Sequence, residues 1–130
     1  MTTERGDHLK LGELGEKIAC RYLRKKGYRI AETRFANSQG VRIGEIDIIA
    51  EKDKMLVFIE VKTRNASYQE RYTPEANINK RKLFKLNKIA QVYLHQKKKL
   101  QRSYRFDAIS IFYNHENKKA LVKHIESIFI

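Results

Sequence analysis

The stretch of sequence that decides the fold is Gly44-Glu-Ile-Asp-Ile-Ile-Ala-Glu-Lys-Asp-Lys-Met-Leu-Val-Phe-Ile-Glu-Val-Lys-Thr63. Two runs rich in β-branched and aromatic residues, 46–49 and 56–61, flank the polar segment Glu51-Lys-Asp-Lys54, which has the composition of a turn. So short a connection predicts an antiparallel hairpin. Because both runs are almost continuously apolar, we expect both faces of the sheet to be covered, as in an α/β protein.

Charged side chains interrupt these two apolar strands. Side-chain alternation places Glu60 and Lys62 on one face of the second strand, and Asp47 lies between two isoleucines of the first. Buried carboxylates are costly unless they are paired or bind a metal. The three residues therefore suggest a site, although charges at alternate strand positions are usually a solvated face and Glu-x-Lys triplets arise by chance.

The two strand motifs also resemble a known active site. Gly44-Glu-Ile-Asp-Ile-Ile-Ala50 and Phe58-Ile-Glu-Val-Lys-Thr-Arg64 are similar to the active-site hairpin of the YraN-like family. That family is a branch of the restriction-endonuclease-like, PD-(D/E)xK nuclease superfamily, close to archaeal Holliday-junction resolvases. The resemblance covers nearly the whole chain and includes the segments Gly15-Glu-Lys-Ile-Ala19, Arg105-Phe-Asp107 and His124-Ile-Glu126.

The chain departs from the family pattern at two places. Glu45-Ile-Asp47 stands where the superfamily name has Pro-Asp, and Ile78-Asn79 stands where a Thr is more frequent after the apolar residue. Neither departure removes a metal ligand.

The resemblance implies a metal-dependent nuclease that hydrolyses phosphodiester bonds in nucleic acid, in the manner of a structure-specific resolvase. Asp47 and Glu60 would bind Mg²⁺ or Mn²⁺, since hard cations prefer carboxylate oxygens, with the Val61 carbonyl as a third ligand. Lys62 would orient the nucleophilic water or stabilise negative charge. Glu16, where the family has an acidic residue, would complete the catalytic set; a surface charge on a helix is the alternative.

Composition limits the possibilities further. A chain of 130 residues is one domain, 1–130, in which we expect residues 1–8 to be loose. The single cysteine allows no internal disulfide, and no signal peptide or membrane span is recognisable, so we expect a cytoplasmic protein. A formal net charge of +13 indicates a polyanionic partner. Nucleic acid fits better than an anionic membrane, and we favour DNA over RNA.

Two long helices are predicted from the 3.6-residue period. The first runs from about Leu9 to Lys26 and ends at Gly27. On it Glu16 lies at the rim of the apolar arc, close enough to reach the sheet, whereas Cys20 lies opposite the arc and should be exposed. The second helix runs from Asn79 to about Leu100.

Basic residues supply the candidate nucleic-acid contacts. Cations at the start of a helix oppose its dipole, which makes more sense if phosphates lie nearby. A solvated charged face is the alternative. The candidates are Lys80, Lys82 and Lys85 on the second helix, with Lys82 preferred, and Arg42 and Arg64 at the ends of the hairpin.

Other polar residues have structural interpretations. We expect Asp107 to form a salt bridge with Arg105 or a lysine, and His124 to be a hydrogen-bonded histidine of an edge strand, with a metal ligand as the less favoured alternative. Tyr68 and Tyr72 lie in the polar loop 65–78, which is either a substrate-contacting flap or only a connection.

The expected architecture is therefore α/β: a mixed central sheet of about five strands flanked by helices, restriction-endonuclease-like, in the order α-β-β-β-α-β-β. The competing function is a basic nucleic-acid-binding module that has this fold but does not cut. A basic protein–protein adaptor has no sequence feature of its own in favour. A homodimer is one arrangement to expect, because resolvase-like relatives act as dimers.

Overall fold

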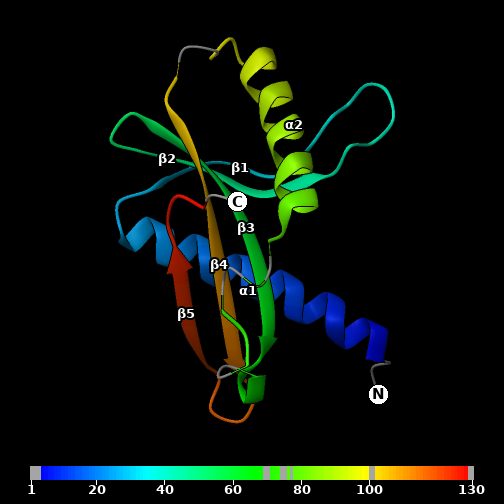
Figure 1. Ribbon diagram of the computed structural model, residues 1–130. Helices are drawn as coiled ribbons and strands as arrows, with labels where there is room; N and C mark the ends of the chain where they lie inside the picture. The colour runs from blue at the N-terminus through cyan, green and yellow to red at the C-terminus, as the bar shows by residue number, and fades with distance from the viewer. Residues whose placement is uncertain (1–3, 69–70, 74–75, 77, 100–101, 129–130) are drawn as a thin grey trace.

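The computed structural model describes residues 4–68, 71–73, 76, 78–99 and 102–128, with side chains from residue 11 onward. The predicted element order, α-β-β-β-α-β-β, is confirmed (Figure 1). A short 3₁₀ helix, η1, follows the third strand. The elements are α1 (Glu4–Lys25), β1 (Arg29–Ala36), β2 (Glu45–Lys52), β3 (Met55–Asn65), η1 (Ala66–Tyr68), α2 (Lys80–Gln96), β4 (Tyr104–Asn114) and β5 (Lys119–Ile125).

The five strands form one mixed sheet in sequence order, β1-β2-β3-β4-β5. Only β3 and β4 pair in parallel, and the other neighbours are antiparallel. A parallel pair needs a long crossover connection, which the segment containing α2 provides. In Figure 1, β1 and β2 run across the direction of β3 and β4, so the sheet is strongly twisted.

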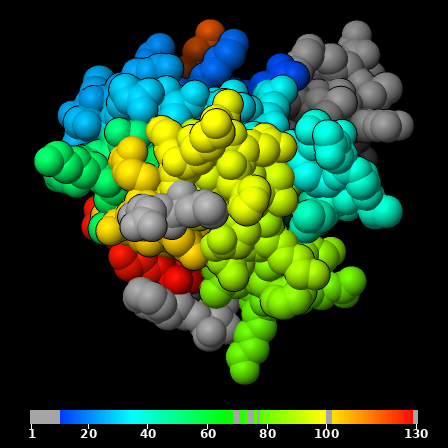
Figure 2. Space-filling model, turned by 90° about the horizontal axis from the view of Figure 1, so that it is seen from above, coloured from blue at the N-terminus to red at the C-terminus, as the bar shows by residue number. Residues whose placement is uncertain are grey.

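One helix covers each face of the sheet, as the continuous apolar strands predict. On one face α1 buries Ala19 and Leu23 in a cluster with Ile48 and Ile59. On the other, α2 buries Ile89 and its apolar neighbours in a cluster around Phe58. In Figure 2 the yellow-green and yellow atoms of α2 occupy much of the visible surface. Fully burying a side chain such as Leu23 or Phe58 stabilises the fold by about 1.5–3 kcal/mol.

A glycine lets α1 approach the sheet closely. A Cβ atom at Gly15 would overlap the side chain of Thr63 on β3. Because glycine has no Cβ, the backbone of α1 can lie directly against the end of the strand that carries Glu60 and Lys62. This contact brings Glu16, the next residue of the helix, to the same end of the sheet.

The hairpin between β2 and β3 is tighter than the sequence suggests. Glu51 and Lys52 belong to β2, so the turn contains only Asp53 and Lys54. Both turn residues have positive φ angles, 50° and 66°. Two left-handed residues in a two-residue loop are typical of a type I′ turn, whose twist matches that of the flanking strands.

Three predictions about the helices need correction. α1 begins at Glu4, so residues 4–8 are helical and not loose; residues 1–3 lie outside the described residues. Cys20 is only 8% exposed and not on the surface. Because α1 crosses β1, β3, β4 and β5, a wider arc of its surface is covered than one apolar stripe. α2 ends at Gln96, since Lys98 adopts a left-handed conformation (φ 55°) that stops the helix.

The start of α2 matches its prediction. Asn79 is the N-cap, and its Oδ1 accepts a hydrogen bond from the Lys82 backbone N–H at 2.8 Å. Asn is as good an N-cap as the Ser or Thr that could stand there, which explains the second departure from the family pattern. Within the described residues, neither helix is both long and apolar enough to cross a bilayer.

Candidate functional site

The carboxylates of Asp47 and Glu60 lie together where β2 and β3 separate. The last registered pair of the two strands is Ile48 with Ile59, and continuing that register by one step places Asp47 opposite Glu60. At this point the Asp47 Oδ2 atom accepts a hydrogen bond from the Val61 backbone N–H at 2.7 Å. A carboxylate has therefore replaced a backbone carbonyl as the acceptor between the strands, and it is fixed in place next to Glu60.

Burial and mutual repulsion make this pair reluctant to ionise. Burial, followed by the nearby charge of Glu60, raises the pKa of Asp47 from 3.8 to about 7, against the opposing effect of the Val61 N–H. Burial also raises the pKa of Glu60, although Lys82 and a hydrogen bond with Asp47 oppose the shift. Near neutral pH the pair therefore shares a proton when no cation is bound.

Lys82, in the first turn of α2, places a positive charge beside this pair of carboxyl groups. Its Nζ lies 3.3 Å from Glu60 Oε1, and the Glu60 side chain is only 14% exposed. The Asn79 cap fixes the first turn of α2, from which this lysine extends. The preferred nucleic-acid contact of the sequence analysis is thus engaged with a candidate metal ligand, which the spacing of the lysines alone did not reveal.

A cleft of about 490 Å³ opens between α1 and this end of the sheet. Asp47, Lys62 and Glu16 all line it, so the structure brings these three predicted residues to one cavity. Lys62 is exposed, and within the described parts of the chain it forms no ion pair. The complete lining consists of Leu11, Gly12, Glu13, Glu16, Arg34, Glu45, Asp47, Val61, Lys62 and Thr63.

An arginine positions Glu16 at the edge of the cleft. Arg34 Nε donates to Glu16 Oε2 at 3.1 Å, and the Glu16 side chain is 19% exposed. Arg34 has φ 53°, a left-handed conformation that costs energy in a non-glycine residue. The strained strand residue and the helix thus hold a second acidic group near Asp47, whose pKa the Glu16 charge also raises.

The other basic residues predicted to contact nucleic acid have different surroundings in the structure. Lys80 and Lys85 are exposed on the first turns of α2. Arg42 Nη2 donates to Glu45 Oε2 at 2.7 Å, in an exposed pair. The guanidinium of Arg64 lies over the ring of Tyr72, 4.0 Å from its centroid.

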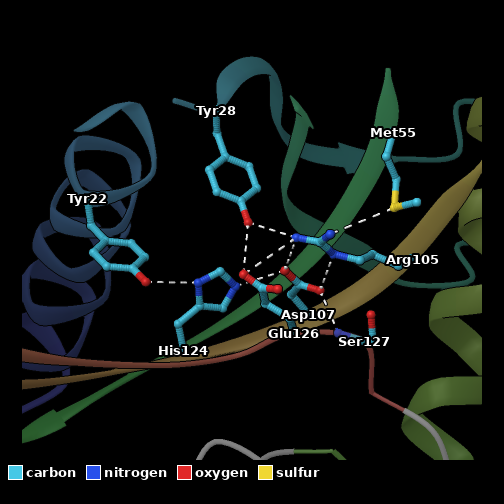
Figure 3. A network of polar contacts seen from close by, with 8 residues as sticks. All are labelled: Tyr22, Tyr28, Met55, Arg105, Asp107, His124, Glu126 and Ser127. Atoms are coloured by element: carbon cyan, nitrogen blue, oxygen red, sulfur yellow. Dashed lines mark hydrogen bonds and ion pairs between the residues drawn. The ribbon is translucent and has the colours of Figure 1, made fainter. Parts of the chain in front are cut away.

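A second acidic site, on β4 and beyond the residues that line the cleft, has a different chemistry (Figure 3). Asp107 is fully buried, and its Oδ1 accepts hydrogen bonds from Arg105 Nε and the Ser127 N–H, both at 3.0 Å. His124 Nε2 lies 2.8 Å from Asp107 Oδ2. Burial alone would raise the pKa of Asp107, but these hydrogen bonds outweigh it and lower the pKa. Both predictions for these residues, an Arg105 salt bridge and a hydrogen-bonded histidine, are confirmed.

Sequence reasoning missed the two tyrosines that complete this network. The Tyr22 hydroxyl lies 3.0 Å from His124 Nδ1, and the Tyr28 hydroxyl accepts from Arg105 Nη2 at 2.7 Å. The Asp107 carboxylate requires a donor from Nε2; in a neutral imidazole this leaves Nδ1 to accept from the Tyr22 hydroxyl. The only sequence signal was two tyrosines at apolar-face positions, where a phenolic hydroxyl needs a buried partner.

The donor set at the cleft suits a hard divalent cation. Among the described residues, no group of three or more Asp, Glu, His or Cys side chains lies at metal-binding spacing. Mg²⁺, however, keeps several waters and takes only one or two carboxylates. Asp47 and Glu60 are such a pair, and burial raises the pKa of both carboxyl groups.

Comparison with known sequences gives one consistent result. The uncharacterised protein family UPF0102 matches residues 15–111. A UPF0102 protein of Syntrophomonas wolfei is 40% identical over 121 residues, 92% of this chain and 97% of the relative. Another, of Caldanaerobacter subterraneus, is 42% identical over 121 residues, 92% of this chain and 93% of the relative. One of Alkaliphilus metalliredigens is 40% identical over 108 residues, 83% of this chain and 90% of the relative.

Proposed function

The chain belongs to the uncharacterised protein family UPF0102, and we propose that it is a metal-dependent nuclease that hydrolyses phosphodiester bonds in nucleic acid. The observation that carries the proposal is the contact between the half-buried carboxyl groups of Asp47 and Glu60, of which Asp47 is fixed by the Val61 N–H and lines an open cleft. A half-buried pair of acidic side chains is expensive for a fold to maintain. A bound cation is the simplest reason to keep it.

Asp47 and Glu60 would hold Mg²⁺ or Mn²⁺. The N–H and C=O of one strand residue point toward the same neighbouring strand, so the Val61 carbonyl, like its N–H, is directed to the side of Asp47 and can serve as a third ligand. When bound, the ion supplies positive charge at the phosphate and favours ionisation of the attacking water. Lys82 is already paired with Glu60, so part of this ion pair would have to give way when the Glu60 carboxylate binds the cation.

The remaining residues of the cleft act on substrate and water. Lys62 is exposed in the same cavity as Asp47, where its ammonium group can donate to a phosphate oxygen or orient water. Glu16, held by Arg34, can accept a hydrogen bond from a water on the opposite wall. The excess of basic residues gives affinity for the nucleic-acid backbone, DNA in the first instance, without reading its sequence.

The decisive experiment compares cleavage with binding. Purified protein is incubated with branched, single-stranded and duplex DNA in Mg²⁺ or Mn²⁺, and binding is measured separately in EDTA. Asp47→Ala and Glu60→Ala should abolish cleavage while binding is kept or improved, because each carboxylate repels phosphate in the absence of metal. Lys62→Ala should abolish cleavage without strengthening binding. Cleavage that survives the loss of both carboxylates would refute the proposal.

A nucleic-acid-binding module that does not cut is the second candidate. It is favoured by the Lys82–Glu60 ion pair, which already gives one of the two carboxylates a cationic partner. On this alternative the wild-type protein binds nucleic acid with a strong salt dependence, yet cleaves none of the substrates in either metal ion. Equal cleavage rates in Mg²⁺ and in EDTA would exclude both candidates.

A further inference from the structure

Two exposed tyrosines and two arginines gather beyond the end of β3. Tyr68 and Tyr72 are 41% and 36% exposed, and their ring centroids are 6.1 Å apart. Arg64 lies 4.0 Å from the ring centroid of Tyr72, and Arg71 lies 5.8 Å from that of Tyr68. Each ring therefore has a guanidinium group against it while a large part of its surface remains open to solvent. We call Arg64, Tyr68, Arg71 and Tyr72 the aromatic platform.

The aromatic platform lies at the end of β3, the strand that carries the proposed catalytic residues Glu60 and Lys62. The pairing of β3 with β4 runs without a register shift from Leu56 to Asn65. Side-chain alternation therefore places Glu60, Lys62 and Arg64 on one face of β3. Four residues of strand span about 13 Å, so a nucleic-acid strand whose phosphate lies at Glu60 can reach the guanidinium of Arg64.

Arg64 also carries a hydrogen-bond donor that the described residues leave unused. Its Nη1 atom is buried and has no partner among them. Buried polar atoms are rarely left without a partner, and a guanidinium donor matches a phosphate oxygen well. Stacking on Tyr72 holds the planar group in a fixed orientation.

Resting on the proposed function, we infer that the aromatic platform binds an unpaired nucleotide base next to the cleavage site. An exposed tyrosine ring offers a stacking surface for any base, and a neighbouring arginine adds a cation–π contact and a phosphate donor. Bases in a continuous duplex are stacked on each other and cannot use such a surface. The substrate class is therefore nucleic acid with a single-stranded or splayed segment, such as a flap, a gap or the centre of a junction.

Binding in EDTA tests this inference independently of cleavage. The probes are a fluorescein-labelled oligothymidylate and a blunt duplex of equal length, measured by anisotropy. For the double variant Tyr68→Leu/Tyr72→Leu, single-strand affinity should fall by about tenfold for each stacked base, while duplex affinity stays unchanged. The double variant Tyr68→Phe/Tyr72→Phe keeps both rings and should bind like wild type, which excludes a general folding defect.

Phe84→Leu is the matched control. Phe84 on α2 is another exposed aromatic residue with a cation against its ring, from Lys88, and it should have no effect on either probe. Equal losses of single-strand and duplex binding in the leucine variant, no loss at all, or phenylalanine variants as weak as the leucine ones would overturn the inference. So would a wild-type protein that binds neither probe.

The two proposals fail in different ways. Single-strand binding that depends on the rings, in a protein that never cleaves, would leave the aromatic platform standing and remove the nuclease. Carboxylate-dependent cleavage with unchanged single-strand binding in the leucine variant would keep the nuclease and remove the platform.

Discussion

Asp47→Asn is expected to stabilise the protein in the absence of metal, although it deletes a group of the proposed active site. In the folded protein the pKa of Asp47 is about 7, against an ordinary value of 3.8. Because the unfolded chain releases this proton more readily, the folded state loses stability as pH rises between about 4 and 7. Asn has nearly the same shape, still accepts from the Val61 N–H, and can donate to Glu60 without carrying a charge.

The size of this gain in stability follows from how far the pKa of Asp47 is raised. Roughly 3 pKa units correspond to about 4 kcal/mol at most, since each unit is worth about 1.4 kcal/mol. The two carboxyls share one proton and the site is partly solvated, so we expect about half of this, about 2 kcal/mol. For a domain of this size that is a rise in Tm of roughly 6–8 °C at pH 8, with no difference between variant and wild type below pH 4.

Thermal unfolding from pH 4 to 9, with and without Mn²⁺, measures the stabilisation by Asp47→Asn and any stabilisation by the bound metal. Mn²⁺ at about a hundred times its Kd should stabilise the wild type by about 2.7 kcal/mol and leave Asp47→Asn unchanged. Glu45→Gln is the matched control, because Glu45 lines the same cleft but is an exposed carboxylate paired with Arg42. An Asp47→Asn variant that is no more stable than wild type at pH 8, or that gains as much from Mn²⁺, would refute the reasoning.

Two further predictions concern stability away from the cleft. Asp107→Ala should lower the free energy of unfolding by about 3–5 kcal/mol, since it leaves buried cationic and polar donors without their acceptor. The pKa of Asp107 is lowered, so its contribution is present above about pH 4 and is lost as pH falls; urea denaturation of wild type and variant should converge in acid. In the hairpin, replacing Asp53-Lys54 by Asn-Gly should raise stability by about 0.5–1 kcal/mol in the same assay, because both positions are left-handed. A loss of stability there would contradict the type I′ assignment.

Much of the fold was predictable from local patterns. The apolar runs 46–49 and 56–61 are strands with both faces covered, and the helices lie where the 3.6-residue period places them. The failures have a common cause, which is that tertiary contacts are not local. Nothing near Cys20 in the sequence indicates that α1 crosses four strands, and Lys98 ends α2 by taking a conformation usually adopted by glycine.

The candidate site was predictable as a set of residues but not as a set of contacts. The helical period was enough to bring Glu16 to the rim of the cleft that Asp47 and Lys62 also line, whereas Glu60 is not among the residues that line it. The ion pair between Lys82 and Glu60 depends on how α2 packs over the sheet, which no short-range pattern encodes. The ring contact between Arg64 and Tyr72 depends on the path of a loop, and loops leave the weakest pattern in a sequence.

Two aspartates of the sheet, Asp47 and Asp107, differ in how their charges are compensated, and this difference is why we propose a functional role for one acidic site and a structural role for the other. Asp107 receives hydrogen bonds from Arg105, His124 and Ser127, so its charge is fully compensated and its pKa falls. Asp47 receives one backbone N–H, and its burial, followed by the charge of Glu60, raises its pKa. If folding were the only requirement, Asn or an apolar residue would serve better at position 47. The charge of Asp107 is already compensated by donors from the protein, whereas Asp47 faces a second carboxyl group and lines an open cleft. A cation is therefore proposed at Asp47 and not at Asp107.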